Sequence, residues 1–224
     1  MADASTALKT LENDLRGVFG ARLQSLVQYG AHAATGDHAH GHHAPVLLHS
    51  LVVVEALTAN DLSECAKRIV DWHEAGLATP LILPAAELDR SLDVFPFEFS
   101  AIIADHVVVA GKNPFDGLRV EPADLRWACE VQARSHLLHL RQGFVEARGR
   151  GDALAVLIVR SAPAWAALLT NVARLENKPA AVDDVTRLVG VKEIANDAAV
   201  RMFPAYLDAV GRLTTQVDGW SEAK

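Results

Sequence analysis

Cysteine is nearly absent from this chain. Its 224 residues include two cysteines, Cys65 and Cys129, which lie far apart and form no CxxC pair. Disulfide frameworks and thiolate zinc sites need several cysteines at short spacings, so neither is predicted. Both cysteines fall in helical patterns, and we expect them to be small residues of a hydrophobic core.

The chain also lacks an excess of basic residues. It carries 21 lysines and arginines against 28 aspartates and glutamates, a net charge of −7. Proteins that bind nucleic acid or anionic membranes use clustered Lys and Arg to neutralise phosphates, so this balance argues against both partners. The remaining candidate partners are a small molecule, a nucleotide or another protein. The sequence does not indicate an oligomeric state.

No apolar run is long enough to span a membrane. The most hydrophobic run, Leu154–Val159, is followed by Arg160 and Pro163, whereas a span requires roughly 20 apolar residues. We therefore expect a buried helix there. The stretch Met1–Arg16 contains acidic residues and no apolar segment typical of a signal peptide, so the expected location is cytoplasmic.

The composition that is present, 50% hydrophobic and 22% charged residues, is typical of a soluble globular protein. The length suits two domains. Strand-like segments give way to helical ones between Asp116 and Pro122. We therefore predict an α/β domain over residues 1–118 and a helical domain over residues 119–224.

Two apolar, β-rich runs, Leu23–Tyr29 and Leu48–Val54, flank a loop rich in Gly and His, and they predict two strands. Thr58 and Asp61 have the spacing of a helix cap before an amphipathic segment, and the run Leu81–Leu83 predicts another strand. This order of strands and helix indicates a sheet covered by helices.

The stretch Asp93–Gly111 is interpreted as extended. In a strand, Phe97 and Phe99 would point to one face and Glu98 to the other, because side chains alternate. Glu98 would then stand apart from its apolar neighbours.

Apolar residues at helical spacing predict four helices in the second half. The expected helices are Pro122–Arg148, Asp152–Glu176, a shorter one over Val182–Val189 and a last one over Tyr206–Val217. The predicted fold class is therefore α+β, a mixed sheet with helices followed by an all-α four-helix bundle. Glu130 and Arg134 lie four residues apart on a polar stripe, which is typical of a solvated ion pair or of a cleft wall.

Tyr29-Gly30, at the end of one strand, and Leu48–Val54 resemble the opening of the DNA polymerase beta superfamily of nucleotidyltransferases. The helical second half resembles the kanamycin-nucleotidyltransferase branch of that family. Its members close the first strand with Gly-Ser and begin the second with two aspartates, one residue apart. Here Ala31 replaces the serine, and Leu48 and Ser50 replace the aspartates. Because the family's chemistry uses two divalent ions held by carboxylates, the resemblance implies a diverged, non-catalytic protein.

The resemblance also implies a place for the site. A later strand of the family delivers a third carboxylate, which Glu98 matches here, and the helical domain helps to hold substrates. We therefore predict that Gly30, Ser50, Glu98, Glu130 and Arg134 line a cleft between the domains, with no catalytic residue. The expected occupant is a nucleotide-like ligand or a protein partner, and Mg²⁺ or a nucleotide is the implied cofactor.

Histidines crowd the loop between the first two strands. His38, His40, His42 and His43 are candidate ligands of Zn²⁺ or a similar ion. A loop of Gly and Ala offers no side chains to orient the rings, so adventitious metal binding is the alternative interpretation.

Two other functions stay open. One is an active metal-dependent nucleotidyltransferase whose metal ligands are displaced. The other is a HEPN-like ribonuclease or its antitoxin partner, because Arg134 and His139 match the Arg-x4-His spacing of that family.

Overall fold

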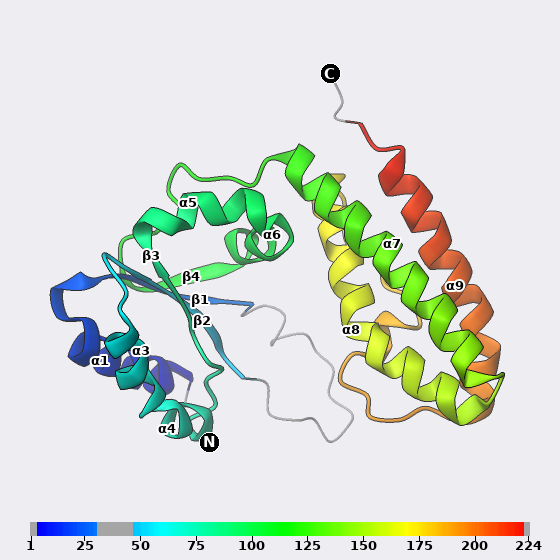
Figure 1. The fold of residues 1–224 in the computed structure, drawn as a ribbon, viewed down its shortest axis with the longest axis horizontal. Coiled ribbons are helices and arrows are strands. Elements are labelled where there is room, and N and C mark those ends of the chain that lie inside the picture. The colour runs from blue at the N-terminus through cyan, green and yellow to red at the C-terminus, as the bar shows by residue number, and fades with distance from the viewer. Residues whose placement is uncertain (1–3, 31–46, 222–224) are drawn as a thin grey trace. The chain divides into compact units, whose positions relative to one another are not determined.

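The computed structural model of the chain describes residues 4–30 and 47–221. The chain divides after Val120 into two compact units, here called the first unit and the second unit (Figure 1). The elements of the first unit are α1 (Ala4–Phe19), a 3-10 turn (Gly20–Arg22), β1 (Leu23–Tyr29), β2 (His49–Val54), α3 (Ala59–Ala66), α4 (Ile69–Glu74), β3 (Leu81–Pro84), α5 (Ala85–Val94), α6 (Pro96–Ala104) and β4 (His106–Gly111). The elements of the second unit are α7 (Pro122–Ala147), α8 (Gly151–Leu175), a 3-10 turn (Thr186–Leu188) and α9 (Asn196–Asp218).

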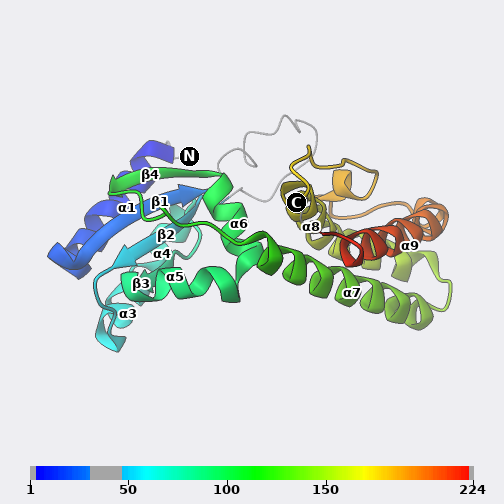
Figure 2. The same cartoon turned by 90° about the horizontal axis from the view of Figure 1, so that it is seen from above.

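The sheet of the first unit has the strand order β3-β2-β1-β4, which Figure 2 shows from one edge to the other. β1 pairs antiparallel with β2 and β4, whereas β2 and β3 are parallel. The predicted fold class, a mixed sheet with helices followed by a helical region, is confirmed. The strands expected over Leu23–Tyr29, Leu48–Val54 and Leu81–Leu83 are β1, β2 and β3.

Helices cover both faces of this sheet. α1, α3 and α4 lie on one side and α5 and α6 on the other (Figure 1). Because side chains alternate along a strand, Val52 and Val54 join the apolar cluster with α1, while Leu51 and Val53 join the cluster with α5 and α6. A strand buried on both faces reads as a continuous apolar run, which explains the sequence of β2.

A side-chain cap begins α3, as the sequence predicts. The Thr58 hydroxyl accepts a hydrogen bond from the Asp61 amide, and the Asp61 carboxylate accepts one from the Thr58 amide. Arg22 donates two more hydrogen bonds to Asp61, at 2.8 and 2.7 Å. Hydrogen bonding by Arg22, more than any other contact, holds the pKa of Asp61 well below its usual range.

The extended interpretation of Asp93–Gly111 is wrong for its first half. Residues 96–104 form the helix α6, and only residues 106–111 form a strand, β4. Pro96 takes the first helical turn, where its missing N–H is no loss. Phe99 and Ile102, three residues apart, then point into the cluster against the sheet. Phe97, Glu98 and Phe99 alternate as in a strand, but Phe99 and Ile102 also have the spacing of a helix. The packing against the sheet buries the helical pair.

The second unit contains three long helices, α7, α8 and α9, within the part of the chain that the structure describes. The fourth helix expected over Val182–Val189 is instead one 3-10 turn, Thr186–Leu188. The Asp183 carboxylate accepts hydrogen bonds from the amides of Val185 and Thr186, as an N-cap does, so a helix begins here. It ends after one turn, just before Gly190, whose φ of 83° is not helical. The other predicted helices are confirmed.

By length and composition, α8 is able to cross a membrane. Its buried residues nevertheless occur along its whole length, and they include Leu154, Ile158, Trp165 and Leu168. The helix packs against both α7 and α9. These contacts are typical of a helix in a bundle core, as expected for Leu154–Val159.

Candidate functional site

The end of the sheet where β1 finishes and β2 begins is the place predicted for the site. Gly30 follows β1 with φ of 69°, a conformation that suits glycine. Its amide donates to the carbonyl of Asp105 at 3.0 Å, and Leu48 forms a bridge to Leu77. Asp105, before β4, therefore lies beside Gly30, and Leu48, before β2, lies beside the segment that leads to β3.

Ser50 lies opposite Gln28 in this part of the sheet. Its residue is 1% exposed, and its Oγ has no hydrogen-bond partner among the described residues. Leu48, two residues earlier and on the same face, packs against the apolar cluster that includes Val52. The two positions predicted to match the family's aspartates thus hold a half-buried leucine and a buried serine with an unpaired hydroxyl.

Three side chains with rings, Tyr29, His49 and His106, lie on the opposite face of the sheet from Ser50, at the same end. The sequence alone does not predict that they meet. Tyr29 pairs with His49 on β2 and with His106 on β4. The rings of Tyr29 and His49 lie 5.6 Å apart, and burial raises the pKa of Tyr29. His106 is held by the Ile103 carbonyl at 3.0 Å and by the Asn113 side chain at 3.2 Å. Each residue is visible in the sequence, but their meeting depends on the pairing of three strands.

Glu98 does not join this group by way of a strand. It lies in the first turn of α6, with an exposed side chain. The expectation that a later strand carries it is wrong, because the strand that pairs with β1 begins at His106.

Glu130 and Arg134 form an ion pair with an N–O distance of 2.8 Å on α7. Arg134 also reaches Asp218 at the end of α9, again at 2.8 Å, so the pair ties two helices together. His139 contacts the Ser135 carbonyl one turn away at 2.8 Å. Glu98 belongs to the first unit and Glu130 and Arg134 to the second, and their meeting in one cleft stays a prediction.

A polar chain inside the second unit links its three helices. Ser161 on α8 donates to the Ile158 carbonyl at 3.0 Å, so the Tyr206 hydroxyl must supply the proton of its own 3.1 Å bond to Ser161. His136 Nε2, 2.6 Å from the Tyr206 hydroxyl, is then the donor to it. Burial, followed by the nearby His139, lowers the pKa of His136 to about 4. His136 is therefore a neutral, half-buried residue at pH 7.

Acid should weaken the second unit through this histidine. Between pH 6.5 and about 4 the unfolded chain binds a proton at His136 that the folded chain does not, so stability falls as pH falls. From pH 7 to pH 5 we expect a loss of roughly 1–2 kcal/mol from this group, allowing for its partial exposure. Urea unfolding at both pH values measures it. His136→Gln should lose this part of the pH dependence. His73→Gln, at an exposed histidine, is the control and should keep it. Equal pH profiles of stability for wild type and His136→Gln would show that His136 is not the group responsible.

The comparisons with known proteins concern the whole chain. No protein-family model matches it, and no curated protein matches its sequence. Among solved structures, it is similar to the spectinomycin adenyltransferase AAD(9) from Enterococcus faecialis, determined with ATP and spectinomycin. The TM-score is 0.50 at 12% sequence identity, covering 94% of this chain and 99% of that one. The fold is nucleotidyltransferase-like. Because identity is so low, the likeness establishes the fold alone.

The nucleotidyltransferase-like unit does not offer the donors of a two-ion centre at the expected positions. Mg²⁺ prefers carboxylate oxygens, whereas Leu48 has none and Ser50 has a single buried hydroxyl. Residues 4–30 and 47–221 contain no group of three or more His, Cys, Asp or Glu side chains placed to hold a metal ion. His38, His40, His42 and His43 lie outside the described residues, so the zinc site stays a prediction.

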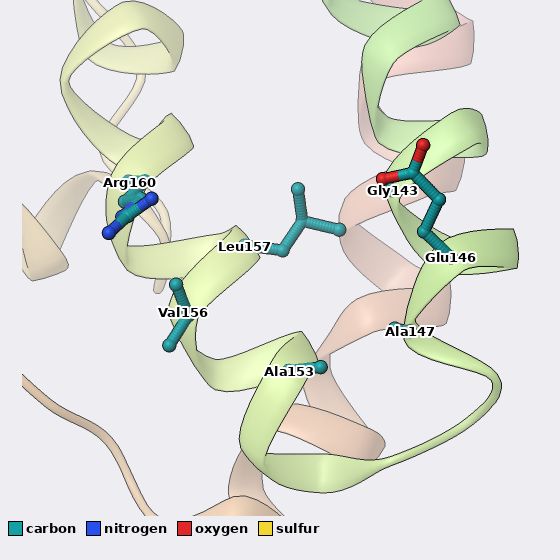
Figure 3. A pocket seen from close by; sticks show the side chains of 7 residues that line it. All are labelled: Gly143, Glu146, Ala147, Ala153, Val156, Leu157 and Arg160. Carbon is teal, nitrogen blue, oxygen red and sulfur yellow. The ribbon is translucent and has the colours of Figure 1, made fainter.

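Two hollows are large enough to consider as binding sites. In the first unit, a cavity of about 660 Å³ opens at the end of the sheet away from Gly30, lined by Gln24, Ser25, Val53, Ala85, Leu88, Asp89, Gly111, Lys112, Asn113, Pro114, Asp116 and Leu118. In the second unit, a shallow groove of about 270 Å³ runs between α7 and α8. Figure 3 shows Leu157 extending from α8 toward Gly143, where an added Cβ would lie 2.8 Å from it. Neither hollow contains a residue of the predicted site.

Proposed function

We propose that this chain is a diverged nucleotidyltransferase-fold protein that transfers no nucleotide and acts by binding a nucleotide-like ligand or a protein partner. One observation carries the proposal. The start of β2, where the resembled enzymes hold their metal ions, has a half-buried leucine packed against the core and a buried serine with no partner among the described residues. Without carboxylates there, the ions that clamp a triphosphate and activate an acceptor hydroxyl lose their usual ligands.

The choice of ligand class draws on the fold. The similar adenyltransferase was determined with ATP, which supports a nucleotide-like ligand for this chain as well. The net charge of −7 favours a small ligand or a protein over nucleic acid or an anionic membrane. A cytoplasmic location accords with such a role and belongs to the same proposal.

The test is a transfer assay with labelled nucleoside triphosphates and Mg²⁺ or Mn²⁺. The protein should label neither itself, nor small hydroxyl acceptors, nor co-purifying proteins above a reaction without protein. A rise of the Tm with an added nucleotide, in the absence of transfer, is the expected sign of binding without chemistry.

The active alternative predicts the opposite result. Transfer that needs the divalent ion and is abolished by Glu98→Ala would overturn the proposal and show that displaced carboxylates serve the reaction. Glu87→Ala, in the first turn of α5, is the matched control, because Glu87 is also exposed at the start of a helix.

A further inference from the structure

The face of α7 turned away from the core of the second unit carries a line of large apolar side chains among polar ones. Trp127, Val131, Leu138 and Val145 are 61%, 44%, 63% and 74% exposed. Their spacings of four, seven and seven residues place them on one side of the helix. We call these four residues the α7 stripe; at 1.5 Å per residue it is roughly 27 Å long.

The stripe is not part of the packing within the second unit. The buried residues of α7 are Leu125, Ala128, Cys129, Ala133, Leu140 and Ala147, and these serve the contacts with α8 and α9. Single exposed apolar side chains are common on protein surfaces, but four large ones in a line on one helix are not. Contiguous apolar surfaces of this kind mark interaction sites. Val131, Leu138 and Val145 repeat every seven residues, so the apolar side chains form a narrow line along the helix, and another helix is the element that covers such a line.

The charges along α7 suit an antiparallel copy of the same helix. Asp124 stands near its beginning and Arg148 just beyond its end, and neither side chain has a hydrogen bond or ion pair to another described residue. If a twofold axis passes at the level of residue 136, Asp124 of each copy lies opposite Arg148 of the other. Trp127 then lies opposite Val145 of the second copy, so the two ends of the stripe cover each other.

Arg134 is compatible with the middle of this contact. In the same arrangement it lies opposite Leu138 of the second copy, where its aliphatic stem can cover the leucine. Its guanidinium is already bound to Glu130 and Asp218, so Arg134 brings no unpaired charge into the contact. Arg141 lies opposite Val131 in the same arrangement, and its long exposed side chain keeps its charge in water at the edge of the contact.

We propose that a second copy of this chain docks on the α7 stripe, with the two α7 helices antiparallel. The contact is isologous, so the same patch serves both copies and the assembly closes as a dimer. The helix dipoles oppose each other in this pairing, and Asp124 in the first turn of each α7 meets the Arg148 cap of the other.

Sedimentation velocity of the full chain over a wide concentration range tests the proposal. The wild type should show a species of twice 24.1 kDa that dissociates on dilution. Leu138→Lys should shift the protein to a single chain. Val200→Lys is the matched control, because Val200 is 47% exposed on α9, and this variant should stay dimeric.

A charge exchange separates the docking geometry from a general loss of folding. Asp124→Arg and Arg148→Asp should each weaken association by about tenfold, and the two changes together should restore it. A wild type that is a single chain at every concentration overturns the proposal. If the wild type is a single chain and Leu138→Lys also lowers its Tm, then other residues of the same chain cover the α7 stripe. A dimer unaffected by Leu138→Lys or by both charge reversals also overturns it.

Discussion

Gly111→Ala should destabilise the first unit by about 3 kcal/mol or more. Gly111 ends β4 with φ of 80°, in the left-handed region, and it pairs with Ser25 of β1. A Cβ built there would lie 2.0 Å from the Gln24 carbonyl oxygen. That atom belongs to the backbone of the central strand, so it cannot swing aside as a flexible side chain would. The β1–β4 pairing must shift to make room.

Gly117→Ala is the control for this change. Gly117 also has φ of 80°, but a Cβ added to it meets no atom within 4 Å. Its loss should be about 1 kcal/mol, from the backbone conformation alone. Urea unfolding of both variants measures the difference, which isolates the clash. If Gly111→Ala and Gly117→Ala lose the same free energy of unfolding, the strands can move apart at Gly111 without penalty. That result would contradict the close approach of β1 and β4.

Ser50→Asp should lower stability by about 3 kcal/mol at pH 7, because it places an unpaired carboxylate at a position that is 1% exposed. Burial raises the pKa of the introduced carboxyl group. Its folded-state pKa then lies above the unfolded one, so the penalty should grow as pH rises through that window and fade in acid. Tm measurements at pH 4 and pH 8, with and without Mg²⁺ or Mn²⁺, give the result, and neither ion should restore the Tm.

Ser50→Ala is the matched variant at the same position. The Ser50 hydroxyl has no partner among the described residues, so removing it should be neutral or should stabilise the protein by up to about 1 kcal/mol. A large loss for Ser50→Ala would show that the hydroxyl has a partner after all. Restoration of Ser50→Asp by Mn²⁺ would place an ion within reach of β2 and favour the active nucleotidyltransferase.

Local patterns in the sequence determined most elements of the fold. Thr58 and Asp61 specify the start of α3 because both partners of a capping box lie within four residues. Neighbouring residues likewise determine the apolar runs of β1 and β2 and the periodic apolar faces of α7, α8 and α9. The prediction that Leu48 and Ser50 stand where the resembled family has its aspartates also depends on residue identity alone, and it stays a prediction.

Tertiary structure decided the conformation of short segments with two possible periods. Around Glu98, apolar residues fit both an alternating pattern and a spacing of three, and the need to cover the sheet selects the helix α6. Around Val185, the Asp183 side chain caps the start of a helix that the apolar spacing predicts, but the chain forms only one turn before Gly190. Propensity is a weak guide over fewer than ten residues, and packing overrides it.

Contacts between distant segments were also left to the tertiary structure. The sequence contains Tyr29, His49 and His106 as single residues, and the pairing of three strands puts their side chains in one row. It predicts Glu130 beside Arg134, but it does not show that Asp218, 84 residues further on, is the second partner. Helical and strand periods come from covalent spacing, which the sequence contains in full. Which distant side chains meet depends on how the elements dock, and that is a property of the folded chain as a whole.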